Sequence, residues 1–223
     1  MEGYQVRKAV KMDIPFLAEV VIAAEKGRSN KLSYSTLFNI SESEAKKLII
    51  AMLEEEVEGC ELSLSSFRIA EYNGEAVAAI GSWIEGIDGS RPSKILKSNL
   101  ILNTFPKESI EFFKSKSYLV KDIVAEREPL TLQLEYIYIT EKHLGKGLDT
   151  ELIKKSIEDA LIKYPGLQKV QTQLFKNNIM AIIVLRKKGF NVVRSYKSND
   201  KEILDYIPFD EKLVMEKMIN GSN

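Results

Sequence analysis

The chain has 223 residues, of which 44% are hydrophobic, so it is long enough to bury a sizeable core. Lysine plus arginine and aspartate plus glutamate both total 32, and this zero net charge gives no electrostatic argument for binding nucleic acid or an anionic membrane. The single cysteine, Cys60, excludes an intrachain disulfide, and we recognise neither a signal peptide nor an apolar run of about 18 residues. We therefore expect one domain over residues 1–223, in a reducing cytoplasm, with a small molecule or a protein as its partner.

Hydrophobic periodicity and turn residues predict strands and helices in the first part of the chain. We expect strands at 4–10, 65–72 and 75–85, and helices at 14–26 and 41–59. Ser41 with Glu44 three residues later is a capping-box pattern, which marks the start of the second helix. Asn73-Gly74 tolerates positive φ and therefore predicts a tight hairpin between the second and third strands.

Residues 86–130 separate this hairpin from the next strand, and we expect them to form an insertion with structure of its own. They contain two helix-like runs, at 93–103 and 107–126. Beyond them the pattern predicts strands at 131–140, 169–174, after Gly189 and at 212–218, and helices at 148–163 and 179–187.

The most informative segment joins the strand at 131–140 to the helix that follows it. It reads Lys-His-Leu-Gly-Lys-Gly-Leu from Lys142 to Leu148. Glycine has no Cβ, so the backbone at Gly145 and Gly147 can approach an anion, and the first amides of a helix have no intrahelical acceptor. This turn therefore predicts a phosphate site. It is not a Walker A loop, which needs Ser or Thr after the lysine, and it lacks the third glycine of the dinucleotide fingerprint.

The turn resembles the acetyl-CoA loop of the GNAT family of N-acetyltransferases, whose pattern is Arg/Gln-x-x-Gly-x-Gly/Ala. Lys142, Gly145 and Gly147 occupy the matching positions, with lysine in place of the usual arginine or glutamine. The family's later pattern, Asn-x-x-Ala-x-x-x-Tyr-x-x-x-Gly-Phe, is matched by Asn178, Ala181, Gly189 and Phe190. The resemblance covers most of the chain and is specific between about residues 131 and 190. Residues 86–130 have no counterpart in it.

The resemblance implies a mixed α/β (α+β) fold, with a central, mostly antiparallel sheet flanked by helices. The helical insertion 86–130 would lie between the third and fourth strands. It would shape the acceptor side of the site or contact a second copy of the chain in a homodimer, and simple extra packing is the alternative.

The resemblance also implies acetyl-CoA as co-substrate and places it on residues of this chain. The backbone of the strand before the loop would pair with the pantetheine arm at Ile137, Tyr138 and Ile139, and the Asn178 side chain would bond the same arm. The loop and the first helical turn would hold the pyrophosphate, through Lys142, His143, Leu144, Gly145, Lys146, Gly147, Leu148, Asp149 and Thr150.

Glu135 stands where the family often carries a general base. An alkylamine with a pKa near 10.4 is protonated at pH 7, so exposing its lone pair costs roughly 4 to 5 kcal/mol, and a base reduces this cost. The alternative is a strand glutamate that faces solvent or pairs with a lysine. His143 is the only histidine, so no metal site is expected; besides contacting a phosphate, it could be an exposed loop residue.

Two residues depart from the family pattern. Leu185 stands where the family has the tyrosine that protonates the departing thiolate. A thiol with a pKa near 8.5 can leave as thiolate without this donor; alternatively, Tyr136, Tyr138 or Tyr196 could substitute for it. Asp149 stands where many members carry another small residue. A carboxylate about 6 Å from the pyrophosphate would cost roughly 2 to 3 kcal/mol at an effective dielectric near 20.

Asp149 must therefore point away from the pyrophosphate, be offset by Lys142 and Lys146, or mark weakened binding. Its alternative role is that of an acidic residue favouring a helix N-terminus.

We therefore expect an acyltransferase, one that transfers groups other than aminoacyl groups: an acetyl-CoA-dependent N-acetyltransferase. It would move an acetyl group to a primary amine of a small molecule or a protein. One alternative is a non-catalytic acyl-CoA-binding or regulatory module, which Leu185 and Asp149 favour. Another is a phosphate-binding interaction protein that does not use CoA.

Overall fold

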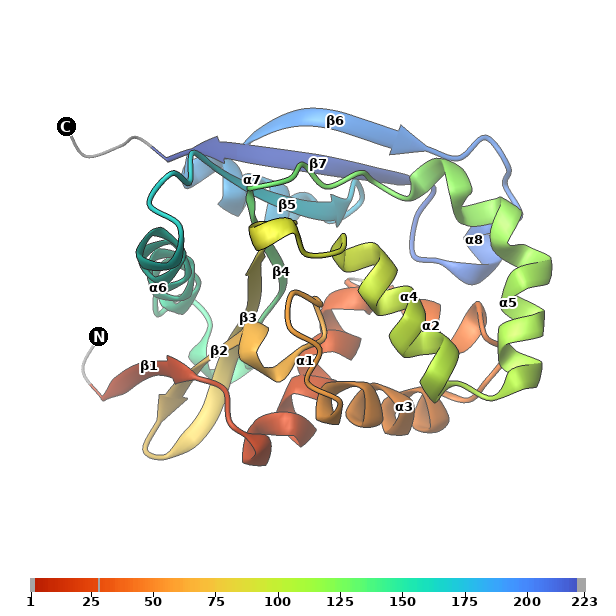
Figure 1. Ribbon diagram of the computed structural model, residues 1–223, viewed down its shortest axis with the longest axis horizontal. Helices are drawn as coiled ribbons and strands as arrows, with labels where there is room; N and C mark the ends of the chain where they lie inside the picture. Colours follow the sequence, from red (N-terminus) through yellow and green to blue (C-terminus); the bar gives the residue numbers. More distant parts are fainter. Residues whose placement is uncertain (1–2, 28, 220–223) are drawn as a thin grey trace.

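A seven-stranded sheet runs through the computed structural model, which describes residues 3–27 and 29–219 (Figure 1). The strands are β1 (Tyr4–Lys8), β2 (Phe67–Tyr72), β3 (Glu75–Ile84), β4 (Leu132–Ile139), β5 (Lys169–Phe175), β6 (Asn191–Lys197) and β7 (Glu211–Met218). Their order across the sheet is β1-β2-β3-β4-β5-β7-β6. In the described residues β4 and β5 run parallel, and the other neighbouring strands run antiparallel. The predicted mostly antiparallel sheet is confirmed.

Helices cover both faces of this sheet (Figure 1). They are α1 (Ile14–Lys26), α2 (Ser33–Thr36), α3 (Glu42–Glu54), α4 (Ser93–Thr104), α5 (Lys107–Val120), α6 (Leu148–Lys163), α7 (Ile179–Lys187) and α8 (Ile203–Tyr206). Successive side chains of a strand point to opposite faces, and Ile69 and Ala70 of β2 accordingly enter two different hydrophobic clusters. One cluster packs α1 to α5 against the sheet, and the other packs α6 and α7. Among the described residues, no helix combines the length and the apolar character needed to cross a membrane.

Local sequence signals account for several element boundaries. The Ser41 hydroxyl accepts a hydrogen bond from the Glu44 amide at 3.1 Å, which confirms the predicted start of α3. Asn73 and Gly74 have φ of 51° and 81° and join β2 to β3, as the hairpin prediction required. The single-turn helices α2 and α8 were not predicted. They depend on contacts distant in sequence, such as the hydrogen bond from the Thr36 hydroxyl to the Tyr206 carbonyl.

The segment 86–130 contains α4 and α5, which lie between the third and fourth strands as predicted. The second helix is shorter than expected, because α5 ends at Val120 and only a turn of 3-10 helix, Lys121–Ile123, follows. Leu100, Leu119 and Ile123 join the hydrophobic cluster that contains α1 and α3. The insertion is therefore packed on the same face of the sheet as α1.

Strand β4 is bent where the candidate site begins. Tyr136 has a φ of 53°, and the register with β3 shifts between Ala79 and Gly81, which produces a bulge. A non-glycine residue in this left-handed region costs about 1 to 2 kcal/mol, so packing must hold it there. A Cβ on Gly81 would lie 3.2 Å from the Glu135 carbonyl oxygen, and the absence of that Cβ lets β3 approach the bulge closely.

Candidate functional site

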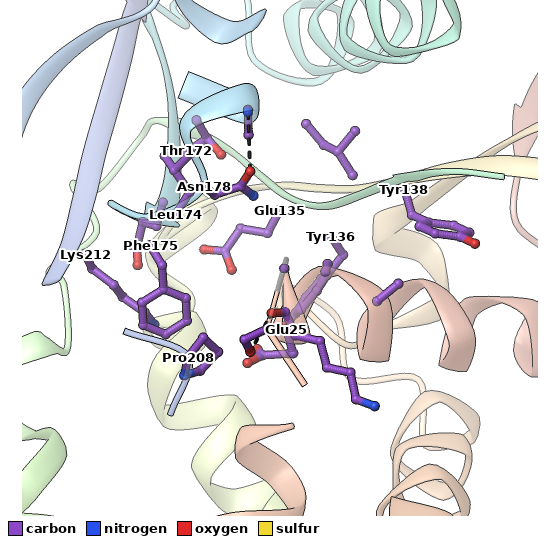
Figure 2. A pocket seen from close by; sticks show the side chains of 18 of the residues that line it. Glu25, Glu135, Tyr136, Tyr138, Thr172, Leu174, Phe175, Asn178, Pro208 and Lys212 are labelled. Atoms are coloured by element: carbon purple, nitrogen blue, oxygen red, sulfur yellow. Dashed lines mark hydrogen bonds between the residues drawn. The ribbon is translucent and has the colours of Figure 1, made fainter. Parts of the chain in front are cut away.

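A cavity of about 530 Å³, here called the main cavity, lies where β4 and β5 separate (Figure 2). The two strands pair over three residue pairs, which end at Leu134 and Thr172. Beyond that point the backbone of β4 that faces β5 has no ladder partner, so its amides and carbonyls are available to an extended ligand. The last turn of α1 and the first turns of α7 complete the walls.

Four of the predicted site residues line the main cavity: Glu135, Ile137, Tyr138 and Asn178. Figure 2 shows the Glu135 carboxylate pointing into the cavity, with Leu174 and Phe175 of β5 on one side. Ile139 and the loop that follows it are not part of this wall. They continue the same strand beyond the cavity.

The two polar atoms of the Asn178 side chain, Oδ1 and Nδ2, have different surroundings. Its Oδ1 accepts a hydrogen bond from the Ala181 amide at 3.3 Å and so caps α7 (Figure 2). Its Nδ2 has no acceptor among the described residues, and the residue lines the main cavity. One donor is therefore left for a ligand.

The loop after β4 has the geometry that an anion requires. Gly145 and Gly147 have φ of 73° and 77°, and a Cβ at either position would meet nothing within 4 Å. The backbone amides of residues 145–149 form no hydrogen bond with the described part of the chain. Gly147 is the N-cap of α6, so these amides stand at the positive end of a helix of 16 residues. Lys142 and Lys146 are exposed beside them.

His143 is half-buried and turns from this loop towards β1 and β2. Its Nδ1 lies 2.8 Å from the Tyr4 hydroxyl, and its ring packs edge-on against Tyr4 and tilted against Tyr72. Neither sequence-based alternative anticipated this contact, because Tyr4 and His143 are far apart in the chain.

Asp149 is neutralised by a lysine that the sequence analysis did not consider for this role. Its Oδ2 lies 2.9 Å from Nζ of Lys188, which follows α7, and both side chains are mostly buried. Lys188 Nζ also donates a hydrogen bond to the Thr150 hydroxyl. The charge of Asp149 is thus offset, by Lys188 rather than by Lys142 or Lys146.

Glu135 belongs to a set of largely buried polar side chains, the Arg127 cluster, formed by four charged residues, Glu61, Lys97, Arg127 and Glu135, together with Tyr136. Nη2 of Arg127 lies 2.7 Å from Oε1 of Glu135 and 2.6 Å from Oε2 of Glu61. Lys97 Nζ lies 2.5 Å from Oε1 of Glu61, and the Tyr136 hydroxyl donates to that oxygen at 2.7 Å. The two positive charges of Lys97 and Arg127 therefore balance the two negative charges of Glu61 and Glu135. The partner of Glu135 is an arginine, not the lysine of the alternative interpretation.

The cluster gives its two carboxylates different acidities. Burial raises the pKa of Glu135, and Arg127 only partly opposes this effect. Burial would also raise the pKa of Glu61, but Arg127 and Lys97 outweigh it and lower the pKa to about 2. Glu61 therefore remains ionised, and Glu135 is the carboxylate suited to exchange a proton.

No tyrosine occupies the place of the missing proton donor. Leu185 is 6% exposed and lines the main cavity without a polar group. The Tyr136 hydroxyl is engaged by Glu61, and burial together with Glu61 raises the pKa of Tyr136 well above its usual value. The Tyr196 hydroxyl lies 3.4 Å from the Glu126 amide, and Tyr196 does not line the cavity. Of the three candidates, Tyr138 alone is a cavity residue with an uncommitted hydroxyl among the described contacts.

Sequence reasoning missed Glu61, Lys97 and Arg127. They come from three separate segments and belong to no motif. Lys97 and Arg127 both lie in the insertion, and Glu61 lies between α3 and β2. Within residues 3–27 and 29–219, no group of His, Cys, Asp or Glu side chains is arranged to hold a metal ion.

No protein-family model and no curated protein matches the sequence. Solved structures do match. An N-acetyltransferase from Staphylococcus aureus Mu50 has a TM-score of 0.63 at 14% identity, over 95% of this chain and 99% of its own. An acetyltransferase of the GNAT family from Streptococcus pneumoniae has a TM-score of 0.52 at 15% identity, over 97% and 99%. The ribosomal-protein-S18-alanine N-acetyltransferase from Escherichia coli has a TM-score of 0.52 at 12% identity, over 99% and 96%. At these identities the likeness shows the fold.

Proposed function

We propose that this chain, which has the fold of the GNAT acetyltransferases, transfers an acetyl group from acetyl-CoA to a primary amine of a small molecule or a protein. One observation carries the proposal. Strand β4 and the turn after it carry, in succession, a largely buried carboxylate at Glu135, an unpaired backbone edge at 137–139 and a turn with free backbone amides at 145–149. A base, a binding edge for an extended arm and a phosphate cradle are the parts that acetyl transfer from CoA needs.

The residues present fit acetyl-CoA, which supplies a thioester-activated acetyl group when bound. The free amides of 145–149 and the start of α6 would hold its pyrophosphate, with the charges of Lys142 and Lys146 nearby. The open edge of β4 at 137–139 would pair with the pantetheine arm, and Asn178 Nδ2 would donate to it. The Lys188 contact keeps the Asp149 carboxylate from repelling the pyrophosphate.

Glu135 would act as the general base. Its Oε1 is fixed by Arg127, while its Oε2 accepts no hydrogen bond from the described residues. Because its pKa is raised, the Glu135 carboxylate is a stronger base, and its pKa differs less from that of the ammonium group whose proton it takes. Glu135 would take one proton from the acceptor ammonium group, and the freed amine would attack the acetyl carbon. As the carbon–nitrogen bond forms, the thioester carbon–sulfur bond would break, and the sulfur would leave as thiolate with the electron pair of that bond. The nitrogen would lose a second proton to water and keep one as the amide N–H.

The absence of a tyrosine at position 185 is compatible with this chemistry. A thiol has a pKa near 8.5, so it can leave as thiolate, and general-acid assistance is worth about 10²- to 10⁴-fold. We therefore expect slower turnover than a site with a proton donor would give, not the loss of the reaction.

The rival function is a non-catalytic acyl-CoA-binding module, which Leu185 favours. A thiol-release assay over a panel of primary amines separates the two. Release that depends on both acetyl-CoA and an amine supports the transferase. Stabilisation by acetyl-CoA without release for any amine would support the binding module.

A further inference from the structure

A second cavity of about 270 Å³, here called the side cavity, adjoins the main one under the insertion. The two share wall residues, among them Glu25, Gln173 and Lys212. Most of the remaining wall is apolar and is contributed by Leu37, Phe38, Ile101, Phe113, Ile123 and Ile207. An acceptor that reaches Glu135 from this side would therefore bury an apolar group.

Hydrogen-bond donors without acceptors surround the same space. The Tyr34 hydroxyl and the Gln173 Nε2 are buried and have no partner among the described residues, and Tyr34 itself is 4% exposed. Burying a donor without an acceptor costs about 1 to 3 kcal/mol, so a ligand that supplies an acceptor removes this cost. A ligand oxygen in the side cavity could therefore accept hydrogen bonds from these two donors.

Lys212 adds a positive charge beside one of these donors. On the paired strands β5 and β7, Lys212 stands opposite Phe175, two residues from Gln173, so the three side chains share one face. Lys212 Nζ lies over the Phe175 ring, 5.0 Å from its centroid, and forms no ion pair with residues 3–27 or 29–219. A carboxylate would satisfy both Lys212 and Gln173.

Glu25 supplies the opposite charge on α1. The other carboxylates of this wall are paired within the Arg127 cluster, whereas Glu25 forms no ion pair with a described residue. Its charge nevertheless reaches the cluster, because Glu25 contributes, after Glu61 and Tyr34, to holding the pKa of Lys97 above its usual value against the effect of burial. An ammonium group in the side cavity would contact Glu25, which lines both cavities, before it reached Glu135, which lines only the main cavity.

We propose that the acceptor is a free α-amino acid with an apolar side chain. Lys212 and Gln173 hold its carboxylate, Glu25 attracts its ammonium group, and the side cavity takes its side chain. The proposal rests on the acetyl transfer proposed above and names the acceptor of that reaction. It distinguishes a free amino acid from a peptide N-terminus, which has no carboxylate at this position.

The test compares L-phenylalanine with phenethylamine, which has the same ring and amine but no carboxylate. Thiol release from acetyl-CoA gives kcat/KM for each compound with the full-length protein. Because the two amines differ in pKa, the informative quantity is how a variant changes the ratio of the two values. We expect Lys212→Met to lower kcat/KM for L-phenylalanine about 10- to 100-fold, as for one charge-assisted contact, and to leave phenethylamine nearly unchanged.

Two further variants complete the design. Gln173→Glu is close to isosteric and places a negative charge beside the expected carboxylate, so it should lower the same ratio. Lys217→Met removes a lysine from the opposite face of β7 and should leave the ratio unchanged. Equal losses for both compounds in Lys212→Met, or no loss for either, would overturn the proposal.

Other outcomes separate this proposal from the proposed function. If phenethylamine or the dipeptide Phe-Gly is acetylated and L-phenylalanine is not, the amino-acid proposal fails and acetyl transfer stands. If no amine is acetylated, acetyl transfer fails, and calorimetric binding of L-phenylalanine in the presence of CoA decides the carboxylate site. Binding that Lys212→Met abolishes supports the site, and no binding overturns it.

Discussion

Nη2 of Arg127 lies 2.7 Å from Oε1 of Glu135, and this contact joins the insertion to the strand that carries the candidate base. The same guanidinium group reaches Glu61 and lies 5.0 Å from the centroid of the Trp83 ring. Trp83 donates a hydrogen bond to Glu85 and is 6% exposed, so the ring that Arg127 packs against is buried and held in place. The insertion therefore contributes to the site itself.

The first prediction concerns the pH dependence of catalysis. Glu135 acts as a base only when ionised, so kcat/KM should rise with pH through its raised pKa. Arg127→Met removes a cation that lowers this pKa, and should move the acidic limb upward by about one to three pH units. Arg127→Lys keeps a charge and should move it less. The measurement is the pH profile of kcat/KM for one amine.

Controls for this profile are available in the same region. Lys107→Met breaks a surface pair with Glu111 in α5 and should leave the limb in place. Glu135→Gln should lower kcat/KM by about 10²- to 10⁴-fold and leave acetyl-CoA affinity nearly intact. An acidic limb that does not move in Arg127→Met would remove Arg127 from control of the base.

The second prediction concerns stability in acid. Because the pKa of Glu61 falls from about 4.5 in the unfolded chain to about 2 in the folded one, its ionisation stabilises the fold above about pH 4.5. That contribution is lost as the pH falls towards 2. Glu61→Gln removes the negative charge that pairs with Lys97 and Arg127. It should therefore lower the free energy of unfolding by about 3 to 5 kcal/mol at pH 7.

Denaturant unfolding at a series of pH values measures both effects. The wild type should lose stability between about pH 4.5 and 2 more steeply than Glu61→Gln does. Parallel curves for the two proteins would show that Glu61 is not the group responsible.

The third prediction separates backbone strain from ligand binding. Gly147→Ala forces a φ of 77° on an L-residue and should cost about 1 to 2 kcal/mol of stability. Gly74→Ala in the β2–β3 hairpin is a matched control, with a φ of 81° and, like Gly147, nothing within 4 Å of the added Cβ. Thermal unfolding should show similar losses for both. Calorimetry should show weaker acetyl-CoA binding for Gly147→Ala only, and equal affinities would argue against the loop as the pyrophosphate site.

The fourth prediction concerns Asp149. Lys188→Met frees its carboxylate near the free amides of the loop, so acetyl-CoA should bind more weakly, and the loss should shrink at high salt. The double variant Lys188→Met/Asp149→Asn should recover most of the affinity, because the repelling charge is gone. An additive loss in the double variant would mean that Lys188 contacts the ligand directly.

Local signals predicted the parts of the fold that depend on a few neighbouring residues. The Asn73-Gly74 turn is set by residues that tolerate positive φ, the start of α3 is set by the Ser41 side chain, and α7 occupies the predicted range 179–187. The Arg127 cluster had no such signal. Glu61 and Arg127 lie far apart in the chain and meet only in the folded structure, and no local pattern marks a charge that will be buried.

The candidate site divides in the same way. The loop glycines were proposed because a glycine-rich turn between a strand and a helix is typical of phosphate sites, and Glu135 and Asn178 because the resemblance to the GNAT family marks their positions. The contact of Lys188 with Asp149 depends on how α7 ends beside α6, which spacing along the chain does not give. Lys212 and Gln173 come together through the pairing of β5 with β7, and the sequence alone does not specify that register.

The most direct test of the central claim is amine-dependent thiol release from acetyl-CoA by the purified chain, with mass spectrometry of the acceptor. Thiol and N-acetylated amine should appear in equal amounts, and Glu135→Gln should slow the formation of both while acetyl-CoA still stabilises the protein. At 100 times its dissociation constant, acetyl-CoA should add about 2.7 kcal/mol of stability. No stabilisation by acetyl-CoA, and no acetylated product from any primary amine, would contradict the claim.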